Sequence, residues 1–233
     1  MPYFDIVREV VPDNTFRVNS VINNFDLDVE HIHEHFSGSL DIEDMDWNVG
    51  LIVGSSGTGK STIARECFGD DYIQGYRYSA KSVIDDMPKG ISVKDIEKTF
   101  TSVGFASPPS WLKPYEVLSN GEKMRTDLAR SILEERDVIC FDEFTSVVNR
   151  EVAKTSSYAI SKAVRKQGKR FVAVACHRDI IEWLEPDWIY DTDEKRFFGQ
   201  RESSIAQSSG RKYTGLTERL RGKYGRYSGS ITI

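Results

Sequence analysis

The most constraining feature of the chain is a glycine-rich segment, GSSGTGKST, at Gly54–Thr62. It follows a continuous apolar run at 49–54 and precedes an amphipathic helical pattern over 63–68. A doubly buried strand, a glycine-rich turn and a helix together form the unit whose backbone N–H groups surround a phosphate. The segment therefore predicts an α/β fold and a site for a phosphate-bearing ligand.

The rest of the chain repeats this alternation of strand and helix. Apolar runs at 138–141 and 171–176 predict two further buried strands, separated by a helix at about 150–166. Alternating strands and helices indicate a mostly parallel sheet flanked by helices. A helix near 92–101 predicts a short helical subdomain. Alternating β-branched and aromatic residues over 4–26, broken by a PDN turn, predict an N-terminal antiparallel hairpin.

Composition excludes several classes of protein. Mean hydropathy is −0.43 and no run of about 18 apolar residues exists, so we expect no membrane insertion. The N-terminus lacks the basic-then-apolar pattern of a signal peptide. Three cysteines, Cys67, Cys140 and Cys176, lie in apolar surroundings, which favours buried thiols and a cytoplasmic location over a disulfide framework.

Charge divides the chain into two parts. We expect a folded domain over 1–200 and a flexible tail over 201–233, where seven Lys/Arg face two Asp/Glu. The rest of the chain is acidic, so a basic tail suits an anionic partner such as nucleic acid, or a protein. A solubilising terminus explains the same composition.

The glycine-rich segment matches the phosphate-loop pattern G-x-x-x-x-G-K-[ST]. Its backbone is expected to contact the phosphates of ATP, with Lys60 reaching the β- and γ-phosphates and the Ser61 hydroxyl binding Mg²⁺. The residues predicted to bind are Gly54, Ser55, Ser56, Gly57, Thr58, Gly59, Lys60, Ser61 and Thr62.

Two acids follow the strand at 138–141. Asp142 is expected at the carboxyl end of a central strand, where a carboxylate binds Mg²⁺. Glu143 then faces the γ-phosphate side, where it can orient or deprotonate water. A solvated strand end is the alternative explanation for two adjacent acids.

A second polar loop, Leu118-Ser119-Asn120-Gly121-Glu122, opens directly onto a helix. With the other motifs it resembles the L-S-G-G-Q/E signature of the ATP-binding-cassette (ABC) ATPases. That resemblance implies a homodimer paired head to tail, in which Ser119, Asn120, Gly121 and Glu122 complete the partner's ATP site. An N-cap serine on an ordinary helix is the alternative.

His177 follows the strand at 171–176 and is similar to the family's switch histidine, which implies a hydrogen bond to the γ-phosphate. A structural histidine at a strand end is the alternative. Within the superfamily, the segments around the signature and WLEPDW look most like bacterial and phage ABC-type ATPases related to those fused with a predicted acetyltransferase domain.

Three positions depart from the family pattern. Asn149 stands where an aspartate is usual, and Asn120 replaces a glycine, which we explain by the tolerance of asparagine for positive φ. Gln74 is the one candidate for the glutamine that the family carries between the phosphate loop and the signature.

An aromatic residue stacks on adenine in this family. Phe25 is our first choice, with Phe36 and Tyr3 as alternatives. The histidines of HIHEH, at 31, 33 and 35, suit either a metal site or a surface loop, and the lack of further ligands favours the loop.

These features predict an Mg-dependent ATP hydrolase that dimerises on ATP and acts on a macromolecular partner. The ATP-binding subunit of a membrane transporter with a separate permease is the alternative. The short segment between Lys60 and Leu118 leaves room for only a small helical subdomain, which counts against that alternative. Glu143 argues against a third class, an ATP-gated scaffold without hydrolysis.

Overall fold

The computed structural model describes residues 3–9, 12–27 and 33–199. The strands are β1 (Tyr3–Glu9), β2 (His33–Ser39), β3 (Val49–Val53), β4 (Tyr72–Ile73), β5 (Val138–Phe141), β6 (Arg170–Ala175), β7 (Trp188–Asp191) and β8 (Arg196–Phe198). The α-helices are α1 (Phe16–Phe25), α2 (Lys60–Phe68), α3 (Val93–Ser102), α4 (Pro108–Trp111), α5 (Asn120–Leu133), α6 (Arg150–Gln167) and α7 (Ile180–Leu184). Two short 3₁₀ helices are η2 (Gly69–Asp71) and η3 (Tyr115–Val117).

The main sheet has the strand order β4-β5-β6-β3-β7-β8, and its pairs are parallel except β7–β8. Leu51 on β3 pairs with Ala173 on β6 and with Ile189 on β7. The predicted parallel α/β core is therefore confirmed, as are the predicted strands and helices that build it. Because the paired strands run parallel, their carboxyl ends share one edge of the sheet.

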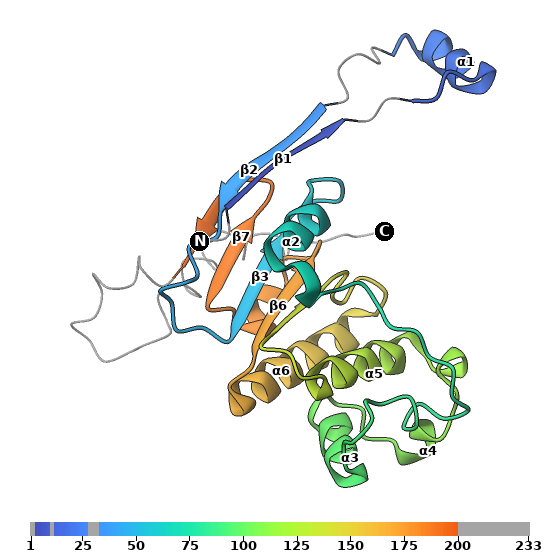
Figure 1. Ribbon diagram of the computed structural model, residues 1–233, viewed down its shortest axis with the longest axis vertical. Coiled ribbons are helices and arrows are strands. Elements are labelled where there is room, and N and C mark those ends of the chain that lie inside the picture. The colour runs from blue at the N-terminus through green and yellow to red at the C-terminus, as the bar shows by residue number, and fades with distance from the viewer. Residues whose placement is uncertain (1–2, 10–11, 28–32, 200–233) are drawn as a thin grey trace.

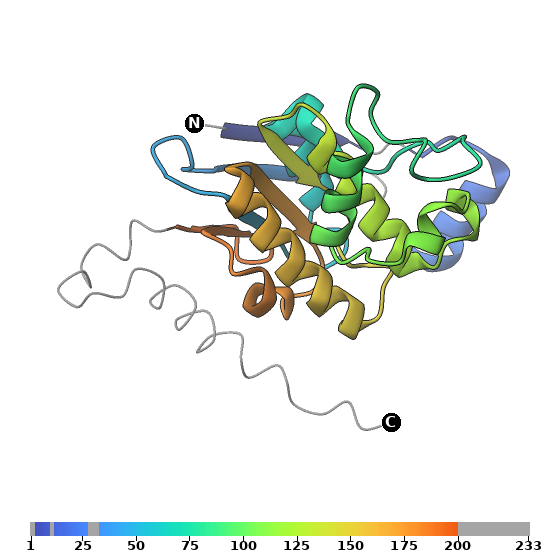
Figure 2. The ribbon, with the colours of Figure 1, turned by 90° about the horizontal axis from the view of Figure 1, so that it is seen from below.

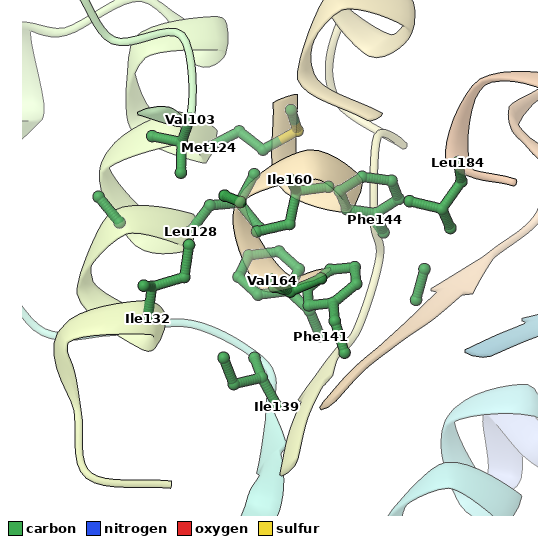
Figure 3. Packing of buried hydrophobic residues seen from close by; sticks show 14 of the residues in the cluster. Val103, Met124, Leu128, Ile132, Ile139, Phe141, Phe144, Ile160, Val164 and Leu184 are labelled. Carbon is green, nitrogen blue, oxygen red and sulfur yellow. The ribbon is translucent and has the colours of Figure 1, made fainter. Parts of the chain in front are cut away.

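The two faces of the sheet bury different partners. Val49, Leu51 and Val53 point into a cluster with α3, α5 and α6, which Figure 3 shows around Leu128, Ile160 and Val164. Ile52 points the other way, toward α2 and the N-terminal strands. This alternation along β3 follows from the two-residue period of a strand and accounts for its unbroken apolar sequence.

The N-terminal antiparallel part differs from the predicted hairpin over 4–26. β1 pairs instead with β2, from Tyr3 opposite Ser39 to Glu9 opposite His33, and residues 16–25 form α1. Apolar residues at 18, 21, 22 and 25 have helical spacing, and the Thr15 side chain caps the helix by accepting from the Val18 N–H at 3.3 Å. Local helical signals override the alternation on which the hairpin was predicted.

We call β1, β2 and the helix between them the β1–β2 arm. Figure 1 shows the arm extending from the main sheet with α1 at its far end, and no residue of α1 is buried. Figure 2, turned by 90°, shows α2 beside β1 and α6 on the other side of the strands. The arm meets the main body near α2, where Phe4 is buried.

Candidate functional site

The glycine-rich segment connects β3 to α2 at the carboxyl edge of the sheet, as predicted. Gly57 has φ +84° and Gly59 has φ +81°, a backbone region that a side chain disfavours. Gly59 precedes Lys60, the first residue of α2, so the positive end of the helix faces the loop. The local geometry is that of a phosphate-binding loop.

The turn between β7 and β8 holds this loop from one side. Thr58 and Thr192 hydroxyls lie 2.6 Å apart, and a Cβ on Gly54 would lie 2.0 Å from the Thr192 hydroxyl. The Asp193 carboxylate accepts from the Ser55 backbone N–H at 3.0 and 3.1 Å. Nothing in the sequence pattern singled out Thr192 or Asp193, because a polar turn after a strand is commonplace.

Asp193 also joins the loop to the segment after β6. Arg178, next to His177, donates to Asp193 at 2.5 Å and to the buried Asp191 at 3.1 Å. Burial opposes ionisation of Asp193, but hydrogen bonds from Arg178 and Ser55 outweigh it and lower the pKa of Asp193. The carboxylate is thus ionised and fixed beside the loop.

The Lys60 ammonium lies over the loop and donates to the Ser55 carbonyl at 2.6 Å. A lysine in this place can move from a backbone oxygen to a phosphate oxygen with little rearrangement of its stem. The predicted position of Lys60 in the loop therefore agrees with the geometry.

Asp142 and Ser61 meet at the edge between β5 and α2. The Ser61 hydroxyl donates to one Asp142 carboxylate oxygen at 3.1 Å, and the Tyr72 hydroxyl donates to the other. Asp142 is only 4% exposed. A hydroxyl and a carboxylate oxygen at this separation are hard ligands of the kind that Mg²⁺ prefers, so the residues present fit that ion.

Glu143 is held in an unusual backbone conformation. Its φ is +51°, and Thr145, two residues on, has φ +67°. The Glu143 N–H donates to the Asp142 carboxylate at 2.9 Å, while the Glu143 side chain is exposed. Positive φ at a β-branched residue such as Thr145 costs about 1–3 kcal/mol, a strain that concentrates at functional sites. The positive φ at Glu143 accompanies a side chain that points outward at the end of β5.

His177 and Gln74 reach the same edge from two further strands. His177 follows β6, and Gln74 follows β4 directly; both are exposed. The Asp142 N–H donates to the Ile73 carbonyl at 2.8 Å, so Gln74 comes immediately after a residue bonded to Asp142. Because β4 pairs with β5, Gln74 lies next to Asp142 at the strand ends, which the sequence around Gln74 did not indicate.

The second polar loop forms the start of α5. Ser119 is its N-cap, and the Glu122 carboxylate accepts from the Ser119 N–H and hydroxyl at 2.9 and 2.7 Å. Hydrogen bonds from Ser110 and Ser119 lower the pKa of Glu122 to about 2. Ser119 thus caps α5, and a capping serine also presents a helix N-terminus that favours an anion, so its role as a signature residue stays a prediction.

Asn120 and Gly121 both lie against neighbouring segments of the chain. Asn120 does not take positive φ, contrary to our explanation for it; it lies in α5 and its side chain donates to the Val147 carbonyl at 3.3 Å. A Cβ on Gly121 would lie 3.1 Å from Val152 on α6. Asn149 caps α6 by accepting from the Val152 N–H at 2.9 Å. The signature thus contacts the segment after Glu143.

A pocket of about 280 Å³ opens beside the phosphate loop. Phe36 on β2 covers Gly59, since a Cβ there would lie 2.4 Å from the Phe36 ring. The pocket is lined by Phe4, Phe36, Ser37, Thr58, Ile63, Tyr190, Thr192, Asp193 and Lys195. An apolar pocket with a few polar groups next to a phosphate loop suits the base and sugar of a nucleotide.

Phe25, the first choice for the residue that stacks on adenine, does not lie in the predicted strand near the phosphate loop. Phe25 ends α1 at the far end of the β1–β2 arm, 71% exposed, instead of ending a strand near the loop (Figure 1). Tyr3 is 65% exposed. Of the three candidates, Phe36 lies in the pocket wall. The misread helix at 16–25 is the cause of the error.

Comparisons with known proteins bear on the fold of the chain. No protein-family profile matches the chain. The ABC multidrug transporter atrD of Emericella nidulans is 30% identical over 97 residues, which cover 42% of this chain and 7% of that transporter. CbiO1 of Clostridium perfringens, part of an ABC transporter complex, matches with a TM-score of 0.55 and 15% identity, over 84% of this chain and 88% of that chain.

Two further similar structures contain a bound nucleotide. The ATP-binding cassette MJ0796, described as a dimer in a post-hydrolysis state with ADP and phosphate, matches with a TM-score of 0.54 and 14% identity, over 68% of this chain and 87% of that chain. A bacterial Atm1-family ABC exporter with ATP bound matches with a TM-score of 0.54 and 17% identity, over 78% of this chain and 37% of that chain. The fold is that of an ATP-binding cassette.

Three expectations from the sequence concern the C-terminal tail, the HIHEH histidines and the acetyltransferase-fused relatives. The tail over 201–233 and the side chains of His31 and His33 lie outside the described residues. His35 bonds Asp5 at 2.5 Å, and the described part of the chain holds no group of three or more His, Cys, Asp or Glu side chains arranged to hold a metal ion. The resemblance to ATPases fused with an acetyltransferase domain receives no support from these relatives.

The three cysteines are free thiols, with Cys140 buried and Cys67 and Cys176 half-buried. Burial raises the pKa of Cys67 to about 12, which disfavours the reactive thiolate at neutral pH. Each helix of the described chain is too short or too polar to cross a bilayer.

The pocket geometry separates Phe36 from Phe25 in an ATP-binding measurement. Phe36→Ala is expected to weaken ATP binding roughly tenfold or more, because stacking of a base on an aromatic ring contributes about 1–3 kcal/mol. Phe25→Ala is the matched control and should leave the dissociation constant unchanged in titration calorimetry. Inorganic tripolyphosphate, which has no base, should bind both variants like the unaltered chain; equal ATP affinity in the Phe36 variant would refute the assignment.

Proposed function

We propose that this cassette is an Mg-dependent ATP hydrolase that works as a head-to-tail dimer. The observation that carries the proposal is one sheet edge that collects the phosphate loop, the Ser61–Asp142 pair and Glu143, with His177 at the end of the neighbouring strand. A separate helix N-terminus at Ser119 offers a second place for a phosphate. Hydrolysis of a nucleoside triphosphate between two copies of the chain explains each of these parts.

In the proposed mechanism the phosphate loop binds and orients ATP. Backbone N–H groups of Gly57–Lys60 and the N-terminus of α2 face the β-phosphate, and the Lys60 ammonium moves from the Ser55 carbonyl to the β- and γ-phosphate oxygens. Ser61 and Asp142 would hold Mg²⁺, which when bound neutralises charge that develops on the phosphates. Phe36 lies against the base.

Glu143 orients the attacking water and accepts its proton. Glu143 has φ +51° and is exposed, so its side chain lies outside the core. The proposal places its carboxylate on the γ-phosphate side. His177 donates a hydrogen bond to a γ-phosphate oxygen, and Gln74 faces the same water from the end of β4. Water attacks the phosphorus in line as the bond to ADP breaks, so the products are ADP and inorganic phosphate.

The partner subunit would supply the second cradle. The Ser119 hydroxyl, which now donates to Glu122, would rotate toward a γ-phosphate oxygen of the other copy, and the N-terminus of α5 would add its backbone N–H groups. The dimeric description of MJ0796 supports such an assembly by analogy of fold.

Glu143→Gln separates ATP binding from hydrolysis. An amide keeps the shape of the side chain but accepts a proton poorly, so turnover should fall at least ~100-fold. ATP should then accumulate in a stable dimer, measured as a doubled mass by light scattering with Mg-ATP and a monomer mass without nucleotide. A variant that stays monomeric at saturating ATP would contradict the dimer.

Mixing two inactive variants tests whether the signature acts on the other copy. Ser119→Arg spoils the cradle and Lys60→Ala spoils the loop, so each homodimer should be inactive while ATP still binds the Ser119 variant. A mixed dimer has one site with an intact loop and an intact cradle, so an equal mixture should recover about a quarter of the full rate. No recovery on mixing would place Ser119 in its own chain's site or outside the reaction.

The comparisons support a membrane transporter as partner better than nucleic acid. The relatives are described as parts of ABC transporters, among them an exporter and the CbiO1 subunit. They match although the segment between β4 and α5 is short, so that shortness weighs less against a transporter than we expected. We therefore favour the ATP-binding subunit of a transporter with a separate permease; a cytoplasmic location remains a prediction.

Duplex DNA tests the nucleic-acid alternative on the full chain. The hydrolysis rate should stay within about twofold when duplex DNA is added at low salt, where any phosphate contacts by basic residues are strongest. Heparin at equal charge is the control for unspecific polyanion effects. Stimulation by DNA, lost as salt rises and absent with heparin, would restore the nucleic-acid partner.

A further inference from the structure

Three tyrosines and one aspartate form a cluster between the segment after β4 and helix α5. The rings of Tyr78 and Tyr115 are stacked, with centroids 4.0 Å apart and planes 7° apart. Both hydroxyls donate to the Asp127 carboxylate, Tyr78 at 2.7 Å and Tyr115 at 2.8 Å. One carboxylate on α5 thus holds two segments that are distant in the sequence.

The next turns of α5 hold the segment after β4 as well. The Arg130 guanidinium lies 4.6 Å from the Tyr76 ring centroid and 5.1 Å from that of Tyr78. Arg130 also donates to the Arg77 carbonyl at 3.0 Å, and the Tyr76 hydroxyl donates to Glu134 at 3.1 Å. Residues 76–78 are therefore fixed to α5 along more than one turn.

The two segments lead to different parts of the proposed site. Residues 76–78 follow Gln74, which lies at the strand end next to Asp142. Tyr115 precedes Ser119, the N-cap of α5, on which Asp127 itself lies. The cluster is therefore one connection between the edge proposed to hold this chain's own nucleotide and the cradle offered to the other copy.

The buried position of Asp127 disfavours its charged form. Burial raises the pKa of Asp127 to about 6, although hydrogen bonds from Tyr78 and Tyr115 and the charges of Arg130 and Lys123 oppose that rise. Above pH 6 the folded chain thus holds a carboxylate that the unfolded chain ionises more easily, which lowers the free energy of unfolding. A buried charge in such a place is better explained by function than by stability.

We propose, building on the ATPase function above, that Asp127 is a positioning residue that makes the segment after Gln74 and the signature at Ser119 move as one body. Occupancy of a chain's own phosphate loop then changes the position of the cradle that it offers to its partner. Asp127 contacts neither ATP nor the attacking water. It acts through Tyr78 and Tyr115, so its loss should affect turnover and cooperativity but leave the loop's affinity for ATP intact.

Asp127→Leu removes the acceptor and keeps the branched shape of the side chain. The maximal rate per site should fall roughly tenfold and the Hill coefficient for ATP should approach one, since such connections modulate coupling by a few-fold to tens of fold. The dissociation constant for ATP, measured with monomeric protein, should stay within about twofold. Asp127→Asn, which can accept from one tyrosine and donate to the other, should recover most of the rate.

Three further variants make the test specific. Tyr78→Phe and Tyr115→Phe keep the stacked rings but lose one hydroxyl each, and each should lower the rate by less than Asp127→Leu does. Ser131→Ala removes another buried hydroxyl of α5, one that donates to the Leu128 carbonyl of the same helix, and should leave the rate unchanged. Asp127→Asn should also raise the midpoint of urea unfolding at pH 7.5, with a smaller gain as pH falls from 6 toward 4.

The outcomes divide cleanly. A full rate and an unchanged Hill coefficient in Asp127→Leu would overturn the positioning role. So would a parallel loss of ATP affinity and stability in both Asp127 variants, which would mean a purely structural residue. An unaltered chain that does not hydrolyse ATP would instead refute the proposed function, and that result is distinguishable because it needs no variant.

Discussion

Parallel pairing of β3 with β6, and of β6 with β5, is the constraint on which the rest of the molecule depends. Parallel strands end at the same edge, so residues that follow them meet there whatever their distance along the chain. Gly54, Asp142 and His177 each come shortly after one of these strands. Slippage of β5 by one residue would turn Asp142 to the opposite face and break its contact with Ser61.

The edge also requires support that costs stability. Glu143 and Thr145 take positive φ, and Asp127 stays buried as a carboxylate with a raised pKa. Large buried clusters on both faces of the sheet compensate for these costs, with Leu51 facing one cluster and Ile52 the other. The arrangement is that of a stable core which holds a strained edge.

Local chemistry decided which parts the sequence could predict. The glycine-rich loop and the acids after β5 are set by short segments in which each residue type has one strong physical reason, and their positions agree with expectation. The pairing of β1 with β2 was missed because it joins residues across an inserted helix, and Phe25 was misassigned with it. Thr192, Asp193 and Asp127 depend on contacts between distant elements, for which no local pattern exists. Asparagine at position 120 was explained by its backbone, but it is the side chain that makes a contact, a hydrogen bond to the Val147 carbonyl.

The central claim is that ATP is hydrolysed between two copies of this chain. The most direct measurement is the rate of phosphate release per protein molecule at saturating Mg-ATP, across protein concentrations that span the monomer–dimer transition found by sedimentation. The account predicts a rate per molecule that rises with concentration and levels off when dimers predominate. A constant rate per molecule down to concentrations at which sedimentation finds only monomers would contradict it.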